Sequence, residues 1–252
     1  MEYRILRMED DLKRALKKPK NKRSWIMVID VDKCIGCHAC VVSCIAENVL
    51  PPRVNYRKVL ETEDGEYPYV KKIFMPTNCM QCDNPPCVKE LPEDSYLKRP
   101  DGILVFEYEK LKGREIYEKI KRKCPYTAVY YDDGDFYTDK TPVIEPYETR
   151  ESFEYGKKWK RVKNEKKSPI NSVRKCHFCL HRLESGMLPA CVTTCIGGAM
   201  YFGDRNDSRS FANELLKKRM AIRMYEDEGT EPRIYYLTGV IFTPETCAKC
   251  HR

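Results

Sequence analysis

Residues 34–44 read CIGCHACVVSC, and this stretch decides the fold. Three cysteines two residues apart, and a fourth three residues further on, give the spacing C-x2-C-x2-C-x3-C. The first three can hold one [4Fe–4S] cluster, whereas the fourth lies on the helix that follows and ligates a different cluster. Gly36 lets the loop backbone approach inorganic sulfide. We therefore expect an iron–sulfur protein.

Three further cysteine groups follow along the chain. The second, CMQCDNPPC at 79–87, has three cysteines, but Leu91 stands where the fourth would fall. The third retains only Cys124, and the first two positions expected before it hold Leu111 and Arg114. The segment before Cys124 has an amphipathic helical pattern instead. The fourth group, CHFC and CVTTC, is interrupted by an eleven-residue insert.

The four groups can be combined in pairs. In two-cluster ferredoxins each fourth cysteine ligates the cluster of the partner motif. If the first group pairs with the fourth, and the second with the third, these cysteines form complete sets of four. The predicted sets are Cys34, Cys37, Cys40 and Cys195 for cluster 1; Cys176, Cys179, Cys191 and Cys44 for cluster 2; and Cys79, Cys82, Cys87 and Cys124 for cluster 3. The ligands of a fourth cluster, at 91 and near 111–117, are all absent. We therefore expect three [4Fe–4S] clusters.

Composition excludes several protein classes. The chain has 252 residues with 14 Cys and a formal net charge of +8. Its cysteines are clustered, not dispersed as in a small secreted disulfide scaffold. No apolar run approaches the roughly 18 residues of a membrane span. The basic stretches favour a solvated surface or an acidic partner over nucleic-acid binding. Gln81 is the only Gln, which is typical of heat-adapted proteins.

The cysteine motifs lie in a wider pattern. The stretches VDKCIGCHACVVSC, PTNCMQCDNPPC, CPYTAVY and KCHFCLHRLESGMLPACVTTC resemble the iron–sulfur β subunits of molybdenum or tungsten bis-pterin oxidoreductases of the dimethyl sulfoxide reductase type. The resemblance implies electron transfer between a catalytic subunit that holds the metal-pterin and a second redox partner, a cytochrome or a membrane anchor. Three clusters make the chain similar to the β subunit of pyrogallol–phloroglucinol transhydroxylase. In four-cluster relatives the missing cluster is on the anchor side, so the usual handoff to an anchor is in doubt.

The resemblance also implies the fold class and the domains. We expect an α+β protein of two interleaved bacterial ferredoxin-like units with short strands and helices, in which one cluster site is lost. The predicted parts are a basic N-terminal extension at 1–23, unit A with two clusters at 24–50 and 170–205, unit B with one cluster at 51–132, a charged connection at 133–169, and a C-terminal extension at 206–252. The connection is predicted to form surface strands over 141–147, and the C-terminal extension a helix within 206–226 and a strand over 232–240.

Several residues near the cysteines could influence the clusters or pack around them. His38, His177 and His181 lie inside the cluster loops and could donate N–H groups to sulfur, although such residues more often face solvent or a partner. Arg182 could act as a fixed charge. The tyrosines, for example Tyr67, Tyr69, Tyr130 and Tyr131, are predicted to pack around the clusters rather than to catalyse a reaction.

The last residues carry a separate motif. Cys247, Cys250 and His251 form CxxCH, the attachment motif of c-type haem, and such a haem would replace the lost cluster. A zinc clip, a disulfide and ligands shared across a subunit interface stay open. Haem attachment takes place outside the cytoplasm, but residues 1–22 lack the apolar core of a signal peptide. We therefore expect an extracytoplasmic, membrane-associated location that is reached by co-export with a partner, and the alternative is a cytoplasmic location.

Two other functions remain open. One is a subunit of a transhydroxylase-like enzyme with no net external electron transfer. The other is a zinc-stabilised scaffold, because CxxC pairs are common zinc ligands. We predict no catalytic residues, since no Ser–His–Asp set, Gly-rich phosphate loop or pair of carboxylates is evident.

Overall fold

The computed structural model describes the chain except residues 1, 155–156, 166, 168 and 240–252. The CxxCH motif at Cys247, Cys250 and His251 lies outside the described residues and stays a prediction. No helix in the described part is long and apolar enough to cross a membrane.

The largest sheet has four strands in the order β10-β1-β12-β11. Its members are β1 (Trp25–Asp30), β10 (Met200–Asp204), β11 (Ala221–Ile222) and β12 (Ile234–Leu237). The central β1 pairs antiparallel with β10 and parallel with β12, so chain segments from both ends meet here. Every residue of β1 is buried, as its apolar sequence requires. The strand expected within 232–240 is confirmed as β12.

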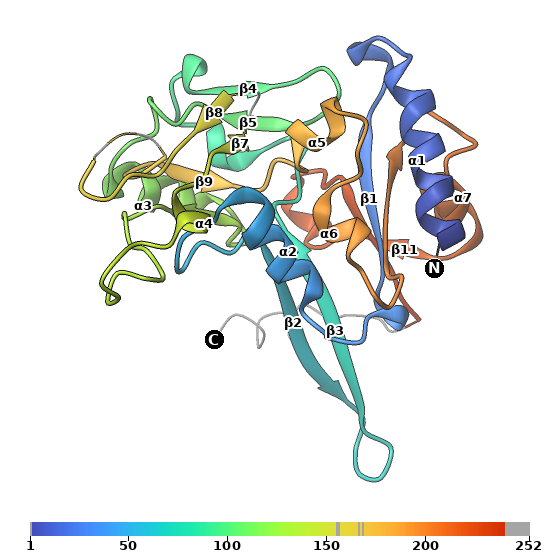
Figure 1. Cartoon of the computed structure of the whole chain (residues 1–252). Coiled ribbons are helices and arrows are strands. Elements are labelled where there is room, and N and C mark those ends of the chain that lie inside the picture. Colours follow the sequence, from blue (N-terminus) through green and yellow to red (C-terminus); the bar gives the residue numbers. More distant parts are fainter. Residues whose placement is uncertain (1, 155–156, 166, 168, 240–252) are drawn as a thin grey trace.

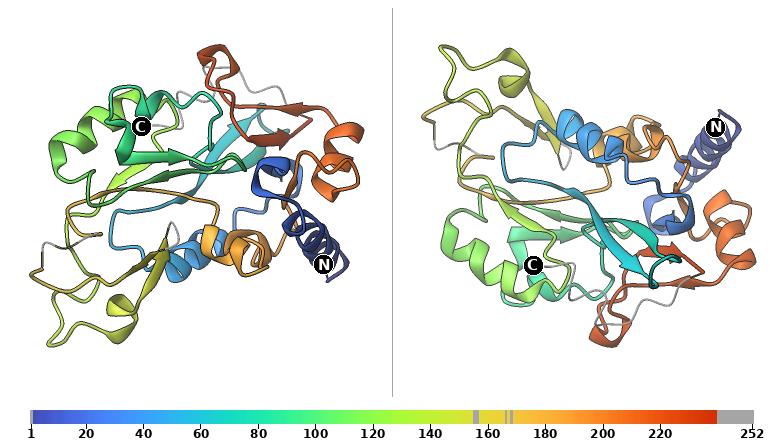
Figure 2. Two further views of the ribbon diagram at one scale, coloured as in Figure 1. Left: turned by 90° about the horizontal axis from the view of Figure 1, so that it is seen from above. Right: turned by 90° about the horizontal axis from the view of Figure 1, so that it is seen from below.

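Two helices pack against this sheet at one end of the molecule, α1 (Glu2–Leu16) and α7 (Phe211–Lys218) (Figures 1 and 2). The helix expected within 206–226 is confirmed as α7. The segment predicted only as a basic extension forms α1, whose Met8, Leu12 and Ala15 are buried. These positions recur at helical spacing, which gives α1 one apolar face.

The twelve cysteines at positions 34–195 lie in the rest of the molecule, among short helices and small sheets. The helices are α2 (Ala39–Asn48), α3 (Arg114–Lys123), α4 (Pro146–Thr149), α5 (Leu180–Glu184) and α6 (Ala190–Thr193). Two-stranded sheets pair β4 (Tyr96–Lys98) with β5 (Leu104–Phe106), β6 (Val129–Tyr131) with β9 (Val173–Lys175), and β7 (Ser152–Glu154) with β8 (Lys157–Trp159). Together these elements confirm the α+β class. Pairing of β6 with β9 links residues predicted for units B and A.

A long hairpin projects from the body (Figure 1). Its strands, β2 (Arg57–Asp64) and β3 (Lys71–Asn78), pair antiparallel along their whole length. The predicted packing of Tyr67 and Tyr69 around the clusters is wrong, because both lie in the turn of this hairpin and are 92% and 86% exposed. Tyr130, in contrast, is buried.

The connection contains surface strands, but not where the sequence suggested. β7 and β8 come after the predicted run 141–147, which forms bends and the start of α4. Pro142 and Pro146 explain the difference, because proline has no N–H for a strand ladder. Pro146 instead occupies the first turn of α4, where proline is favoured.

Packing of α1 can be tested by truncating one buried side chain. We expect Leu12→Ala to destabilise the fold by about 2–5 kcal/mol, since it leaves a cavity against the sheet. The matched variant Leu6→Ala removes an exposed leucine of the same helix and should change stability by less than about 0.5 kcal/mol. Thermal unfolding followed by circular dichroism distinguishes the two; equal midpoints would show that α1 does not contribute to the core.

Candidate metal centres

Site 1 consists of Cys34, Cys37, Cys40 and Cys195, the set predicted for cluster 1. The four cysteines line one cavity, formed by the loop between β1 and α2 and by the end of α6 with the residues after it. Gly36 has a φ of +66°, and a Cβ there would lie 2.5 Å from the ring of Phe74, so the loop requires glycine. Burial raises the pKa of the Cys40 thiol to about 11.

Site 2 consists of Cys44, Cys176, Cys179 and Cys191, the set predicted for cluster 2. These cysteines also line one cavity. Two amides donate to sulfur in it: Asn48 Nδ2 to Cys44 Sγ and Asn78 Nδ2 to Cys176 Sγ, both at 3.5 Å. Such bonds from outside the ligand set are a known means of tuning a metal site.

Site 3 consists of Cys79, Cys82, Cys87 and Cys124, the set predicted for cluster 3. Burial, together with the neighbouring Cys79 and Cys124, raises the pKa of Cys82 to about 12. Cys87 is affected by the same neighbours and by Cys82. The mutual influence of these thiols means that the second and third cysteine groups meet in space, although Cys124 lies far along the chain.

The positions expected to hold a fourth cluster form a small apolar core instead. Leu91 and Leu111, which replace two of its expected ligands, pack into the same cluster of side chains. Ile120 of α3 is buried there as well. The amphipathic pattern before Cys124 thus corresponds to α3, whose apolar side covers this core.

The three sites follow one another in a row. Arg57, the first residue of β2, lies near Cys40 of site 1 and donates from Nη2 to Cys191 Sγ of site 2 at 3.2 Å. Tyr130 lies near Cys44 of site 2 and Cys124 of site 3, and burial raises its pKa. Site 2 is therefore the middle one.

The histidines of the cluster loops differ in their surroundings. His38 is half exposed, near Glu61. His177 is buried, which lowers its pKa well below the usual range, and its Nδ1 accepts the Leu180 N–H at 3.0 Å. The expectation that such residues mostly face solvent is therefore wrong for His177. It is also wrong for His181, whose Nε2 lies 2.7 Å from Glu47 Oε1.

Arg182 donates to the other oxygen of the same Glu47 at 3.0 Å. The Arg182 charge is therefore paired with a carboxylate on α2. Glu47 in this way links the insert after Cys179 to the helix that carries Cys40 and Cys44.

A buried ionic network lies beside the strand that leads into the site 2 loop. The Arg174 guanidinium donates to Asp132 at 2.8 Å, to the Tyr56 hydroxyl at 3.0 Å and to Glu154. All of these side chains are buried. Because Arg174 belongs to β9, shortly before Cys176, the network fixes the start of the site 2 loop. Two carboxylates compensate this buried cation.

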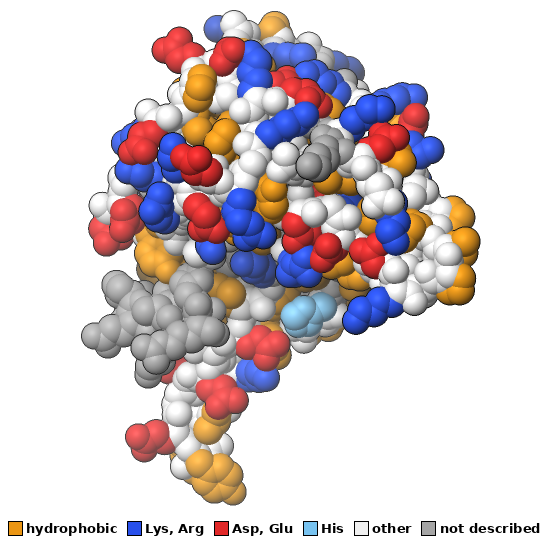
Figure 3. Space-filling model, turned by 90° about the vertical axis from the view of Figure 1, so that its left-hand side faces the viewer, with side chains coloured by type: hydrophobic (Ala, Val, Ile, Leu, Met, Phe, Trp, Pro, Cys, Tyr) orange, Lys and Arg blue, Asp and Glu red, His pale blue; other side chains and the backbone are white. Residues whose placement is uncertain are grey.

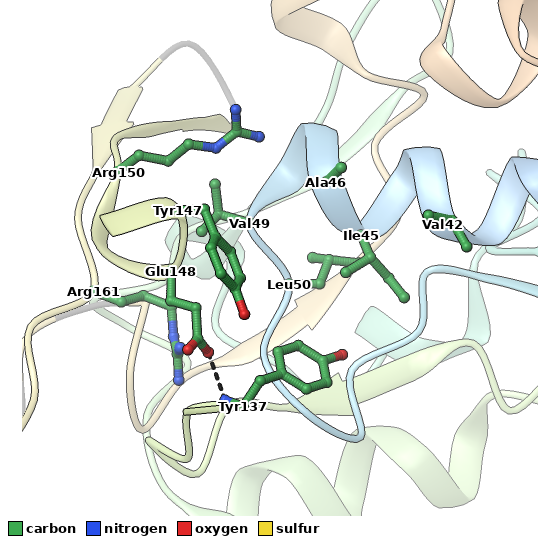
Figure 4. A pocket seen from close by; sticks show the side chains of 10 residues that line it. All are labelled: Val42, Ile45, Ala46, Val49, Leu50, Tyr137, Tyr147, Glu148, Arg150 and Arg161. Atoms are coloured by element: carbon green, nitrogen blue, oxygen red, sulfur yellow. Dashed lines mark hydrogen bonds between the residues drawn. The ribbon is translucent and has the colours of Figure 1, made fainter. Parts of the chain in front are cut away.

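A separate pocket of about 330 Å³ lies on the outer face of α2 (Figure 4). Its lining is mostly apolar and includes Ile45 and Val49 beside Tyr137 and Tyr147 of the connection. Glu148 accepts the backbone N–H groups of Tyr137 and Thr138 and holds this part of the connection in place. No cysteine lines this pocket, so it is distinct from the three sites.

Sequence reasoning missed the polar side chains of Asn48, Asn78 and Arg57, which donate to cysteine sulfur. Asn48 could have been found, because it lies four residues after Cys44 and shares its helix face. Asn78 directly precedes Cys79 but bonds to Cys176, which sequence spacing does not indicate. Arg57 lies outside every cysteine motif, and no signal in the sequence singles it out.

Comparison with known proteins identifies the family. Residues 70–143 and 150–205 match the family model described as a 4Fe-4S dicluster domain. The chain is 50% identical to a selenate reductase subunit of Mesobacillus selenatarsenatis, over 93% of this chain and 78% of that protein. It is 33% identical to a tetrathionate reductase subunit of Salmonella typhimurium, over 86% and 73%. It is 30% identical to the arsenate respiratory reductase iron-sulfur subunit of Shewanella sp. strain ANA-3, over 84% and 94%.

These matches extend over most of the chain and agree with the grouped cysteines. They confirm the predicted resemblance, the ferredoxin-like character of the fold and the presence of [4Fe–4S] clusters. The chain belongs to the 4Fe-4S dicluster family and is an iron–sulfur electron-transfer subunit of the dimethyl sulfoxide reductase type.

Proposed function

We propose that the chain relays single electrons between a molybdenum or tungsten bis-pterin catalytic subunit and a second redox partner, through three [4Fe–4S] clusters held at sites 1, 2 and 3. The observation that carries this proposal is the row of three groups of four cysteines. A [4Fe–4S] cluster supplies one-electron oxidation and reduction, at a potential set by its ligands, by hydrogen bonds to sulfur and by burial.

The residues present fit such clusters better than zinc. Four thiolates around one zinc ion at about 2.3 Å would lie about 3.8 Å from one another. Among the described residues, no three Cys, His, Asp or Glu side chains converge in the manner of ligands to a single ion. The cysteines of sites 1 and 2 instead surround a cavity. In the wall of the site 2 cavity, Arg57 also has two buried nitrogen atoms, Nε and Nη1, that have no hydrogen-bond partner within the described ranges.

The apolar core around Leu91 and Leu111 supports the number of three. A cluster at that place would need thiolates where these leucines pack against Val88 and Phe106. The side chains fill this part of the molecule themselves, so the fold does not depend on a fourth cluster there.

Site 1 is proposed to face the catalytic subunit. Cys37 is exposed, and the exposed apolar side chains of Ile35 and Ile196 adjoin it in the same loops. The hairpin of β2 and β3 lies next to site 1, because Val59 of β2 lines the site 1 cavity and Phe74 of β3 packs on Gly36. Figure 3 shows the hairpin reaching beyond the body, with hydrophobic side chains at its end. Exposed aromatic residues of this kind are frequent anchors of protein interfaces.

The row of sites then runs from the catalytic subunit toward site 3, where the second partner would exchange electrons. We also propose that a c-type haem on Cys247, Cys250 and His251 takes part in this electron exchange. The three relatives described above are subunits of reductases, which favours external electron transfer over a transhydroxylase-like reaction.

Removing one proposed ligand tests the assignment of site 3. We expect Cys124→Ala to lose about a third of the iron, because only one of three clusters depends on it. The matched variant Cys247→Ala removes a cysteine outside the three sets and should keep the iron–sulfur signals of the wild-type protein. Iron analysis and electron paramagnetic resonance of the dithionite-reduced protein provide the readout. Full iron in Cys124→Ala would contradict the assignment.

Binding of the catalytic subunit tests the role of the hairpin. We expect the double variant Tyr67→Ala/Tyr69→Ala to weaken this binding by at least about tenfold, since both aromatic anchors are lost. Tyr147→Ala, at an exposed tyrosine of α4, should not weaken it. Affinity can be measured by biolayer interferometry with the copurified catalytic subunit. Unchanged affinity of the double variant, with its absorption spectrum intact, would exclude the hairpin from the interface.

The visible spectrum tests the haem proposal. If the CxxCH motif holds a c-type haem, dithionite should produce sharp bands in addition to bleaching the broad iron–sulfur absorption. His251→Ala should alter these bands and leave the broad absorption unchanged. A wild-type spectrum without sharp bands would exclude the haem.

A further inference from the structure

Arg57 occupies an unusual position for a charged side chain. It begins β2, is almost completely buried, and belongs to neither cysteine loop that it touches. Its Nη2 donates to two sulfur atoms, Met27 Sδ at 3.1 Å and Cys191 Sγ at 3.2 Å. Arg57 therefore points into the cysteine-rich interior and away from solvent.

The charge of Arg57 has no carboxylate to compensate it within the part of the chain that the structure describes. Its Nε and Nη1 are buried and have no hydrogen-bond partner there. Two other buried arginines have such partners: Arg174 pairs with Asp132 and Glu154, and Arg161 pairs with Asp132. An uncompensated buried cation is costly, so an anionic group is expected beside it.

The anionic groups at hand are the cysteines of two sites. Arg57 lines the site 2 cavity, near Cys191 and Cys176, and it also lies near Cys40 and Cys34 of site 1. A cluster held by four thiolates carries net negative charge, and its sulfur atoms accept hydrogen bonds. Arg57 Nε and Nη1, which have no partner among the described residues, could therefore donate hydrogen bonds to the sulfur atoms of these clusters.

We propose that Arg57 is a shared counter-charge that raises the reduction potentials of the clusters at sites 1 and 2. The inference rests on the proposed function, because it requires clusters at these sites. An added electron makes a cluster more negative, and a buried cation beside it stabilises the reduced state. The step is a one-electron reduction in which no bond breaks. No proton moves, since the guanidinium remains charged.

A redox titration of the full-length, cluster-loaded chain tests this role. We expect Arg57→Gln to lower the equilibrium constant for reduction at both site 1 and site 2 by at least about tenfold, which is ~59 mV for a one-electron couple. Site 3 should be unchanged and serves as the internal reference. Signals are followed by electron paramagnetic resonance and assigned with Cys37→Ser for site 1 and Cys124→Ser for site 3.

Two further variants complete the design. Arg53→Gln makes the same substitution at an exposed arginine that is paired with Asp133 and Asp135, and it should leave all potentials unchanged. Arg57→Lys keeps the charge but loses the planar fork, so it should shift sites 1 and 2 in the same direction by a smaller factor. If Arg57→Gln does not retain its iron, Arg57→Lys alone decides the test.

The proposal is overturned if the Arg57 variants retain their clusters and sites 1 and 2 do not shift. An equal shift at all three sites would also overturn it, since this would indicate a general loss of structure. A wild-type chain without iron–sulfur signals would contradict the proposed function itself, which separates that failure from failure of the role of Arg57.

Discussion

Twelve thiols gathered in fours, all but Cys37 buried or partly buried, are the constraint on which the rest of the structure depends. Burial raises the pKa of Cys40 to about 11 and that of Cys82 to about 12, which favours the protonated thiol at these two positions. Metal binding must replace those protons, and its free energy becomes free energy of folding. The fold around the cysteines is correspondingly poor in regular structure, with many strands of three residues and several helices of four or five.

Interleaving of the chain follows from the same constraint. Cys44 belongs to the first cysteine group in the sequence but lies at site 2, and Cys195 belongs to the fourth group but lies at site 1. Binding of a cluster at either site therefore holds the first and fourth groups together. Glu47 and the Arg174 network add polar links around site 2. The apolar core around β1, α1 and α7 continues into the cysteine-rich half, because it includes cysteines of all three sites: Cys40, Cys79, Cys82, Cys191 and Cys195.

Sequence reasoning reached the cysteine groups, α3, α7 and β12, because motif spacing and apolar periodicity are local signals. Leu91 and Leu111 stand where two cysteine ligands of a fourth cluster would be expected, and they pack into one apolar core. Tyr67 and Tyr69 were misjudged, since alternation does not tell whether a hairpin stays on the body or projects from it. Arg57 was missed because its contacts with Met27 and Cys191 arise only in the folded chain.

The central claim is that three [4Fe–4S] clusters form a row and that side chains fill the place of a fourth. Iron and acid-labile sulfide, measured per full-length chain after anaerobic purification, test it most directly. The account predicts about 12 atoms of each. About 16 of each would contradict the filled fourth site, and metal without sulfide would contradict the clusters altogether.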